Sequence, residues 1–107
     1  MIKLSKIQES SLEVLVVKDI GRVKFVYVKG DEQCSSFIEL MSIMVNEDKQ
    51  RMGYGSELIK SLVELAKKRN IDTIYVKVTN LNEDFKKFME KNHFVKHKEK
   101  IIYQMKL

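Results

Sequence analysis

The first half of the chain alternates apolar and polar positions with the two-residue period of β-strands. The first clear segment, residues 12–18, carries apolar side chains on both of its sides: Leu12, Val14 and Val16 on one, Leu15 and Val17 on the other. Such a pattern is typical of a strand inside a sheet, so we expect this strand to be covered on both faces. A hairpin at residues 19–22 leads to a returning strand at 23–29, and a third strand at 37–45 is expected to be central.

The period changes to that of an α-helix after residue 54. Six apolar residues share one stripe, namely Leu58, Ile59, Leu62, Val63, Leu65 and Ala66. Charged and polar residues fill the opposite face, as expected of a helix that packs on a sheet. We predict a helix over residues 55–69 that ends with Asn70 in the left-handed conformation.

Strand and helix patterns alternate once more in the last third of the chain. We predict a strand at 71–79, a short helix containing Phe85, Phe88 and Met89 behind a cap at Asn80 or Asn82, and closing strands at 94–98 and 100–107. Residues 1–7 are predicted to form a short edge strand. Because a helix joins the third and fourth main strands, these two should run parallel. The order of elements predicts an α+β fold, a mixed and mostly antiparallel sheet with a central parallel pair and two flanking helices.

Composition changes this picture little. An apolar fraction of 44% and a charged fraction of 33% are typical of a globular domain, and we expect residues 1–107 to form a single domain. No apolar run has the length of a membrane helix, and no signal peptide precedes the first strand. The single cysteine, Cys34, cannot form an internal disulfide. We therefore expect a cytoplasmic protein that makes no contact with membranes.

Positive charge gathers toward the end of the chain. Twenty basic and fifteen acidic residues give a net charge of +5. From residue 86 onward two glutamates, Glu90 and Glu99, face seven lysines, namely Lys86, Lys87, Lys91, Lys96, Lys98, Lys100 and Lys106. This excess could attract nucleic acid, an acidic protein or a phosphorylated ligand. Because no recognised nucleic-acid-binding module accompanies the lysines, we favour a solvated face over a nucleic-acid site.

The candidate chemistry lies where the third strand meets the long helix. A polar loop there holds Gly53 and Gly55, and glycine lets a backbone turn sharply and approach a ligand closely. Free N–H groups at a helix start attract phosphate, so we interpret this loop as a pyrophosphate site. A Walker loop would need Gly-Lys-Ser/Thr, and a dinucleotide fingerprint would need a third glycine at the position of Leu58. A plain turn that requires positive φ is the remaining alternative.

The spacing Gln50-x-x-Gly53-x-Gly55 resembles the Gln/Arg-x-x-Gly-x-Gly/Ala signature of the GNAT superfamily, the acetyl-CoA-dependent N-acetyltransferases. The preceding strand also resembles the central strand of that family, with Glu39 six positions before its last residue, Val45. From about residue 12 onward the elements follow the family order. The resemblance implies an acyl-CoA N-acyltransferase fold, acetyl-CoA as co-substrate and no metal.

The resemblance also implies roles for particular residues. Backbone N–H groups of residues 52–56 would hold the pyrophosphate, and the splayed end of the central strand would pair with the pantetheine arm. The implied cofactor-binding residues are Ile43, Met44, Val45, Gln50, Arg51, Met52, Gly53, Tyr54, Gly55, Ser56 and Asn82. Glu39 matches the general base of the protein-lysine branch, and we expect a buried carboxylate there with a raised pKa. A glutamate that reaches solvent or pairs with a lysine is the alternative.

Two features depart from the family pattern. Met89 stands where the family places a tyrosine that protonates the leaving thiolate, and methionine cannot donate a proton. Water, Tyr103 or His93 could substitute. The two helices that usually follow the first strand have no room at residues 8–11. Their absence implies an open acceptor side, suited to a protein or peptide amine or to completion by a partner in a homodimer.

Three functions follow in order of preference. The first is an N-acetyltransferase that acts on a primary amine of a protein or peptide, with Glu39 as the base. The second is a non-catalytic acyl-CoA-binding or sensing module, which the methionine at position 89 favours. The third is a basic nucleic-acid-binding domain that uses the same fold without the cofactor.

Overall fold

The computed structural model describes residues 10–32, 35–77, 83–96 and 102–107. In chain order its elements are β1 (Ser10–Val17), β2 (Gly21–Val28), β3 (Phe37–Val45), the 3-10 turn η2 (Glu47–Lys49), α1 (Tyr54–Lys68), β4 (Thr73–Lys77), α2 (Glu83–Lys91), β5 (Val95–Lys96) and β6 (Ile102–Lys106). Each predicted element that falls on these residues is present, with ends that differ by a few residues. The edge strand predicted at 1–7 lies outside the described residues.

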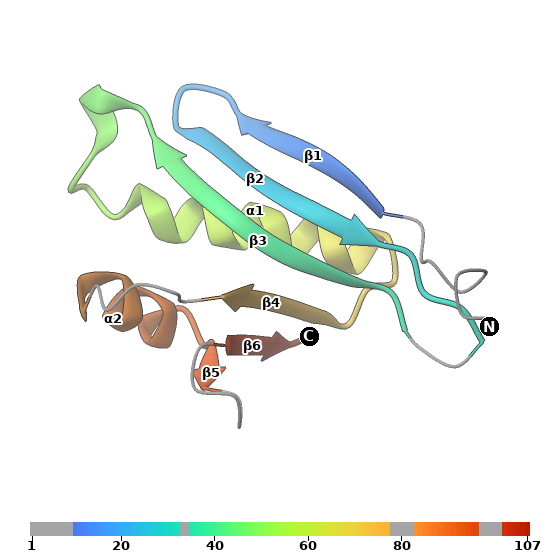
Figure 1. Cartoon of the computed structure of the whole chain (residues 1–107). Coiled ribbons are helices and arrows are strands. Elements are labelled where there is room, and N and C mark those ends of the chain that lie inside the picture. The colour runs from blue at the N-terminus through green and yellow to red at the C-terminus, as the bar shows by residue number, and fades with distance from the viewer. Residues whose placement is uncertain (1–9, 33–34, 78–82, 97–101) are drawn as a thin grey trace.

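The six strands form one mixed sheet in the order β1-β2-β3-β4-β6-β5 (Figure 1). β3 and β4 are parallel, and every other neighbouring pair in the described chain is antiparallel. The predicted α+β fold with a central parallel pair is therefore confirmed. It arises because α1 carries the chain back along the sheet before β4 begins.

The core lies between α1 and one face of the sheet. The apolar stripe of the helix buries Leu58, Ile59, Leu62 and Ala66. Ten further buried residues of the sheet, α2 and their connections complete this core: Val23, Phe25, Ile38, Leu40, Ile71, Ile74, Val76, Met89, Phe94 and Tyr103, with Met105 beside them. Asn70 has φ +60°, which confirms the predicted left-handed end of the helix.

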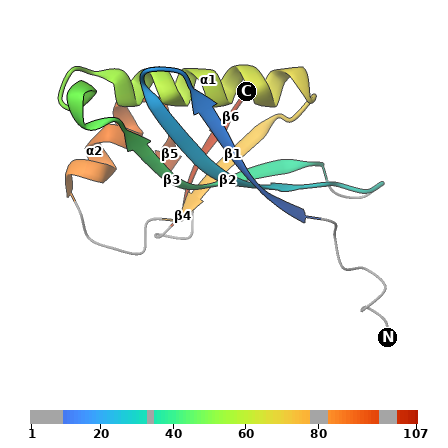
Figure 2. The same ribbon diagram turned by 90° about the horizontal axis from the view of Figure 1, so that it is seen from above.

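Over β1 to β3, no described element covers the opposite face of the sheet, which we call the bare face. Figure 2 shows α1 lying along one side of these strands. The side chains that point to the other side are exposed, with Leu12 at 60%, Val14 at 52% and Val16 at 70%. The expectation that β1 is covered on both faces is therefore wrong. Its alternation with two apolar sides identified a strand correctly, but local pattern does not tell which side another element covers.

Cross-strand registers define what the bare face presents. One transverse row consists of Leu12, Val26, Glu39 and Tyr75, each opposite the next in neighbouring strands. Another row joins Val16, Arg22 and Met44, where the Arg22 guanidinium lies 3.1 Å from the Met44 sulfur. The bare face is thus mainly apolar along β1 and carries a carboxylate in its middle.

Candidate active site

The parallel pairing between β3 and β4 is short. In the described chain it ends with Leu40 opposite Val76, although β3 continues to Val45. The two strands diverge beyond this point in Figure 1. A β-bulge lies next to the divergence. The register between β2 and β3 shifts there, so that Met41 has no partner residue in β2. The last part of β3, which includes Ile43 and Met44, therefore has a backbone edge that faces away from β2 without a described partner strand.

Glu39 lies one residue before this divergence, on the bare face. Its cross-strand neighbours are Val26 and Tyr75, and the Tyr75 ring meets the Phe37 ring edge-on with centroids 5.3 Å apart. The Glu39 side chain is half-buried, not buried as expected from the sequence, because no described helix covers this face. No ion pair among the described residues engages its carboxylate. An approaching amine could therefore reach it.

The loop between β3 and α1 places Gly53 at the start of the helix. Gly53 has φ +83°, and a Cβ built there would meet no atom within 4 Å. The glycine is therefore required by its backbone conformation and not by crowding. Arg51 also has positive φ, at +64°, so two of the three residues 51–53 adopt the left-handed backbone conformation.

Gly55 is required for a different reason. A Cβ at this position would lie 2.9 Å from Cε1 and 3.0 Å from Cζ of the Phe88 ring. Phe88 belongs to α2, so the absence of a side chain at Gly55 lets α2 pack directly on the first turn of α1. This contact brings the two helices together beside the divergence of β3 and β4.

Unpaired amides remain at the start of α1. Within the described chain the amide groups of residues 51–55 donate to no backbone carbonyl, and no side chain caps the helix. The Ser56 amide donates to the Gly53 carbonyl at 3.3 Å, so it belongs to the first helical turn. The Lys49 ammonium lies 5.8 Å from the Tyr54 ring centroid, which adds positive charge nearby. Free N–H groups, the positive helix end and a cation together attract an anion.

Gln50 closes this loop. Its side-chain amide donates to the backbone carbonyl of Val45 at 3.1 Å, across the 3-10 turn η2. The first residue of the signature thus ties the loop to the end of β3. Arg51 and Met52 are exposed beside it.

Met89, at the position of the family tyrosine, and the two side chains that could substitute for that tyrosine differ in position. Met89 is fully buried in the core. His93 is exposed beyond the end of α2 and lines a groove of about 400 Å³ beside α1. Tyr103 is only 3% exposed and lies opposite Val76, in the row where the parallel pairing ends.

The Tyr103 hydroxyl makes no hydrogen bond to any described residue, and no fully buried polar side-chain atom in the described chain lacks a partner. The hydroxyl must therefore be partly accessible. Its ring points to the face covered by α1, because Val76 and Leu40 in the same row are core residues.

Several features considered from the sequence have no counterpart among the described residues. Asn82, predicted to contact the cofactor, lies outside the described residues, as does Cys34. In the described ranges, no group of three or more His, Cys, Asp and Glu side chains could hold a metal ion. No helix within them is long and apolar enough to cross a membrane.

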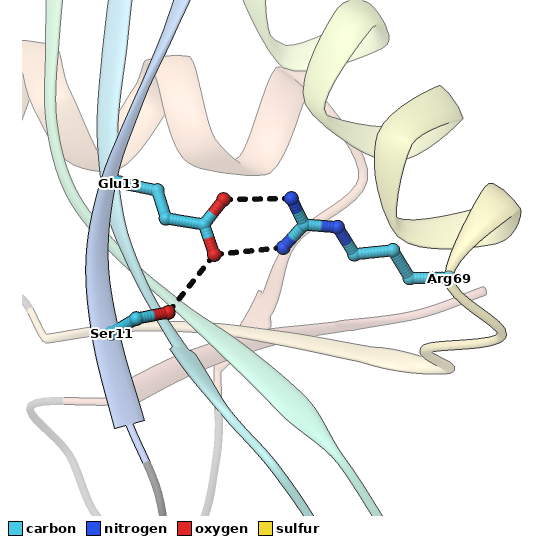
Figure 3. Close-up of polar contacts among 3 residues, drawn as sticks. All are labelled: Ser11, Glu13 and Arg69. Atoms are coloured by element: carbon cyan, nitrogen blue, oxygen red, sulfur yellow. Dashed lines mark hydrogen bonds and ion pairs between the residues drawn. The ribbon is translucent and has the colours of Figure 1, made fainter.

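One ion pair was not foreseen from the sequence. The Arg69 guanidinium donates to both carboxylate oxygens of Glu13, at 2.7 and 2.9 Å, and Ser11 donates to the same group at 3.0 Å (Figure 3). The hydrogen bonds from Arg69 lower the pKa of Glu13, and the same contact raises that of Arg69. The guanidinium also lies over the rings of Phe25 and Tyr27, at 6.0 and 5.3 Å from their centroids. Fifty-six residues separate the partners, so no local pattern could reveal the pair.

Comparison with known sequences supports the resemblance. The sequence profile of the Acetyltransferase (GNAT) family matches residues 11–94, which span β1 to the end of the turn after α2. No curated protein sequence matches the chain.

Solved structures share this fold at low sequence identity. A GNAT-family acetyltransferase from Staphylococcus aureus Mu50 is 18% identical over 82% of this chain, with a TM-score of 0.64. One from Elizabethkingia anophelis, with acetyl-CoA bound, is 19% identical over 82% of the chain, with a TM-score of 0.63. The NatC complex, bound to Gag peptide and CoA, is 11% identical over 82%, with a TM-score of 0.67. The matches cover 60%, 69% and 61% of those three chains, so this chain spans less than two thirds of the first and third.

Proposed function

The chain belongs to the acetyltransferase (GNAT) family, and from that premise we propose that it transfers an acetyl group from acetyl-CoA to a primary amine of a protein or peptide. The observation that carries the proposal is the placement of Glu39 on the bare face, one residue before β3 leaves β4. Acetyl-CoA supplies the activated thioester. All other requirements fall to side chains and backbone groups of this chain.

The start of α1 and the edge of β3 suit coenzyme A. Amides of residues 51–55 offer donors to a pyrophosphate, with Gln50 holding the loop in place. The unpaired edge of β3, at Ile43, Met44 and Val45, offers backbone groups to the amide-containing pantetheine arm. A backbone N–H there would also stabilise negative charge on the thioester oxygen.

Glu39 would accept the proton of the attacking amine, directly or through water. An amine with the pKa of a lysine is largely protonated at neutral pH, so a nearby carboxylate that removes the proton accelerates attack. We assign the complementary step to Tyr103, whose hydroxyl would protonate the departing thiolate. It lies in the same row as the end of the parallel pairing and approaches from the α1 side. Met89 cannot do this, since it is buried and has no proton to donate.

The bare face favours a large acceptor. It is continuous from β1 to the acidic side chain in β3 and lacks a covering helix in the described chain, so an extended peptide could lie across it. NatC, which shares the fold, has been solved with a peptide and CoA. This supports a peptide amine as the acceptor here.

The purified chain should transfer label from acetyl-CoA to lysine-containing peptides or to peptide N-termini. Short polyamines serve as the comparison, and we expect them to react more slowly at equal amine concentration because they cannot span the bare face. Transfer to polyamines alone would contradict the peptide acceptor. Tight binding of acetyl-CoA with no transfer to any amine would favour the second candidate function, a non-catalytic acyl-CoA sensor, which the buried Met89 supports.

A further inference from the structure

The edge strand β1 lacks the usual features that prevent sheet-to-sheet pairing. Within the described chain, β1 pairs with β2 on one side and with nothing on the other. It is eight residues long, contains no proline or lysine and has a continuous register without a bulge. Proteins normally protect such an edge with charges, prolines or bulges, because its free N–H and C=O groups can pair with another strand.

The one charge on β1 is already neutralised. Glu13 points to the α1 side and is held by the two terminal guanidinium nitrogens of Arg69 and by Ser11 (Figure 3). Arg69 reaches it over the rings of Phe25 and Tyr27, which belong to β2. The guanidinium therefore approaches from the inner side of β1 and leaves the outer backbone edge uncovered.

We propose that β1 pairs antiparallel with β1 of a second copy of this chain, about a two-fold axis at Val14. The product is a continuous sheet made from both six-stranded sheets. A homodimer is the partner that this edge fits best, since a two-fold axis brings the same strand of two copies into antiparallel pairing.

The register follows from side-chain parity and charge. If α1 lies on the same side of the sheet in both copies, residues that are opposite each other must point to the same face. The two-fold axis must therefore lie midway between two copies of the same residue. The two longest overlaps place it at Glu13 or at Val14. An axis at Glu13 would place Val16 opposite Ser10 of the partner subunit and would crowd two Glu13–Arg69 ion pairs at the axis, so it would cover less apolar surface.

The axis at Val14 instead creates apolar contacts on the bare face. Val14 lies opposite its own copy, and Leu12 lies opposite Val16 of the partner subunit. These three side chains are between 52% and 70% exposed in the single chain, so each gains cover from the pairing. The self-complementary order of the strand is the reason to infer a second copy and not an unrelated peptide.

Oligomeric state tests the proposal without reference to catalysis. Light scattering after gel filtration should give twice the mass of the 12.6-kDa chain at high concentration and a falling mass on dilution. Val14→Lys places two ammonium groups at the axis and should weaken the dimer about tenfold or more. Val95→Lys is the matched control, since Val95 is 65% exposed on β5 at the other edge of the sheet and should leave the dimer intact.

Cross-linking tests the register. In a Cys34→Ser background, Val14→Cys should form a disulfide between copies, since directly opposed residues lie about 4.5–5.5 Å apart between Cα atoms. Leu12→Cys should not link to itself, whereas Leu12→Cys combined with Val16→Cys should. A monomer at every concentration, or a dimer lost with Val95→Lys and kept with Val14→Lys, would overturn the proposal. Circular dichroism of each variant verifies that it is folded.

Discussion

Two glycines that lie close together at the start of α1 are there for different physical reasons. Gly53 adopts a left-handed conformation in open space, whereas Gly55 has ordinary helical geometry and touches the Phe88 ring. The signature spacing predicted both glycines as phosphate-site residues. The geometry supports that interpretation for the backbone around Gly53, and shows that Gly55 is also a packing position between α1 and α2.

This difference predicts a non-additive pair of substitutions. Gly55→Ala should lower the free energy of unfolding by about 1 kcal/mol, because the new Cβ overlaps the Phe88 ring. In a Phe88→Leu background the same substitution should cost little, since the ring atoms are gone. Urea unfolding of the four chains measures the coupling.

Gly53→Ala is the control for that pair. It should cost about 1–2 kcal/mol through its positive φ, in either background, because nothing surrounds its Cβ. Equal costs of Gly55→Ala with and without Phe88 would show that contact with this ring does not decide the stability.

Glu39 provides the second prediction at this scale. Glu39→Gln keeps the shape of the side chain but removes the base, and general-base assistance contributes roughly 10²–10⁴-fold, so kcat should fall by that order at neutral pH. The loss should shrink as pH rises, because a larger share of the acceptor amine is then already neutral. The KM for acetyl-CoA should stay near the wild-type value. An unchanged kcat would exclude Glu39 as the base.

At the scale of elements, the pair between Glu13 and Arg69 joins β1 to the end of α1. Because Arg69 lowers the pKa of Glu13, the pair adds stability above the unfolded pKa of glutamate, and this contribution is lost as pH falls through the lower folded value. Both side chains are about one-third exposed, at 29% and 33%, so the contribution should be about 1 kcal/mol or less.

The measurable consequence is a difference between two unfolding curves. Wild type should be more stable than Glu13→Gln at pH 7. This difference should begin to shrink as pH falls to the ordinary pKa of glutamate and should disappear only below the lowered pKa of Glu13 in the folded chain. Glu64→Gln is a matched control, since Glu64 lies exposed in the middle of α1, away from both helix ends, and forms no ion pair among the described residues. A difference that persists at acid pH would show that packing, and not charge, is the source of the effect.

At the scale of the whole molecule, one face of the sheet carries the core and the other is open. The start of α1 lies on the covered side of the sheet. The divergence of β3 from β4 connects that side to Glu39 on the bare face. A cofactor held on one side and an acceptor on the other would thus meet where the parallel pairing ends, at Leu40 and Val76.

Binding of acetyl-CoA across this junction should stabilise the entire domain. At a ligand concentration 100 times Kd, mass action adds about 2.7 kcal/mol to the free energy of unfolding, which corresponds to a rise in Tm of about 10 °C. Thermal unfolding with acetyl-CoA, and with adenosine monophosphate as a control that lacks the pyrophosphate and pantetheine, measures this. No rise in Tm at millimolar acetyl-CoA would exclude a built cofactor site.

Sequence alone determined the features that depend on neighbouring residues. Period two and period 3.6 predicted the strands and helices, the helical crossover predicted the parallel pair, and Asn70 predicted the left-handed end of α1. The glycine spacing, together with the family resemblance, also pointed to residues 50–56 and Glu39. Each of these signals is carried by backbone conformation or side-chain pattern within one element and its connections.

Tertiary structure alone decided which faces are covered and which distant groups meet. β1 has two apolar sides, yet only the side toward α1 is covered, so Glu39 is half-buried and the edge of the sheet is left open. The contact of Gly55 with Phe88 and the pair of Glu13 with Arg69 join segments far apart in the chain. Burial and long-range contact depend on how elements assemble, and a local sequence pattern contains no information about the element that does, or does not, lie opposite.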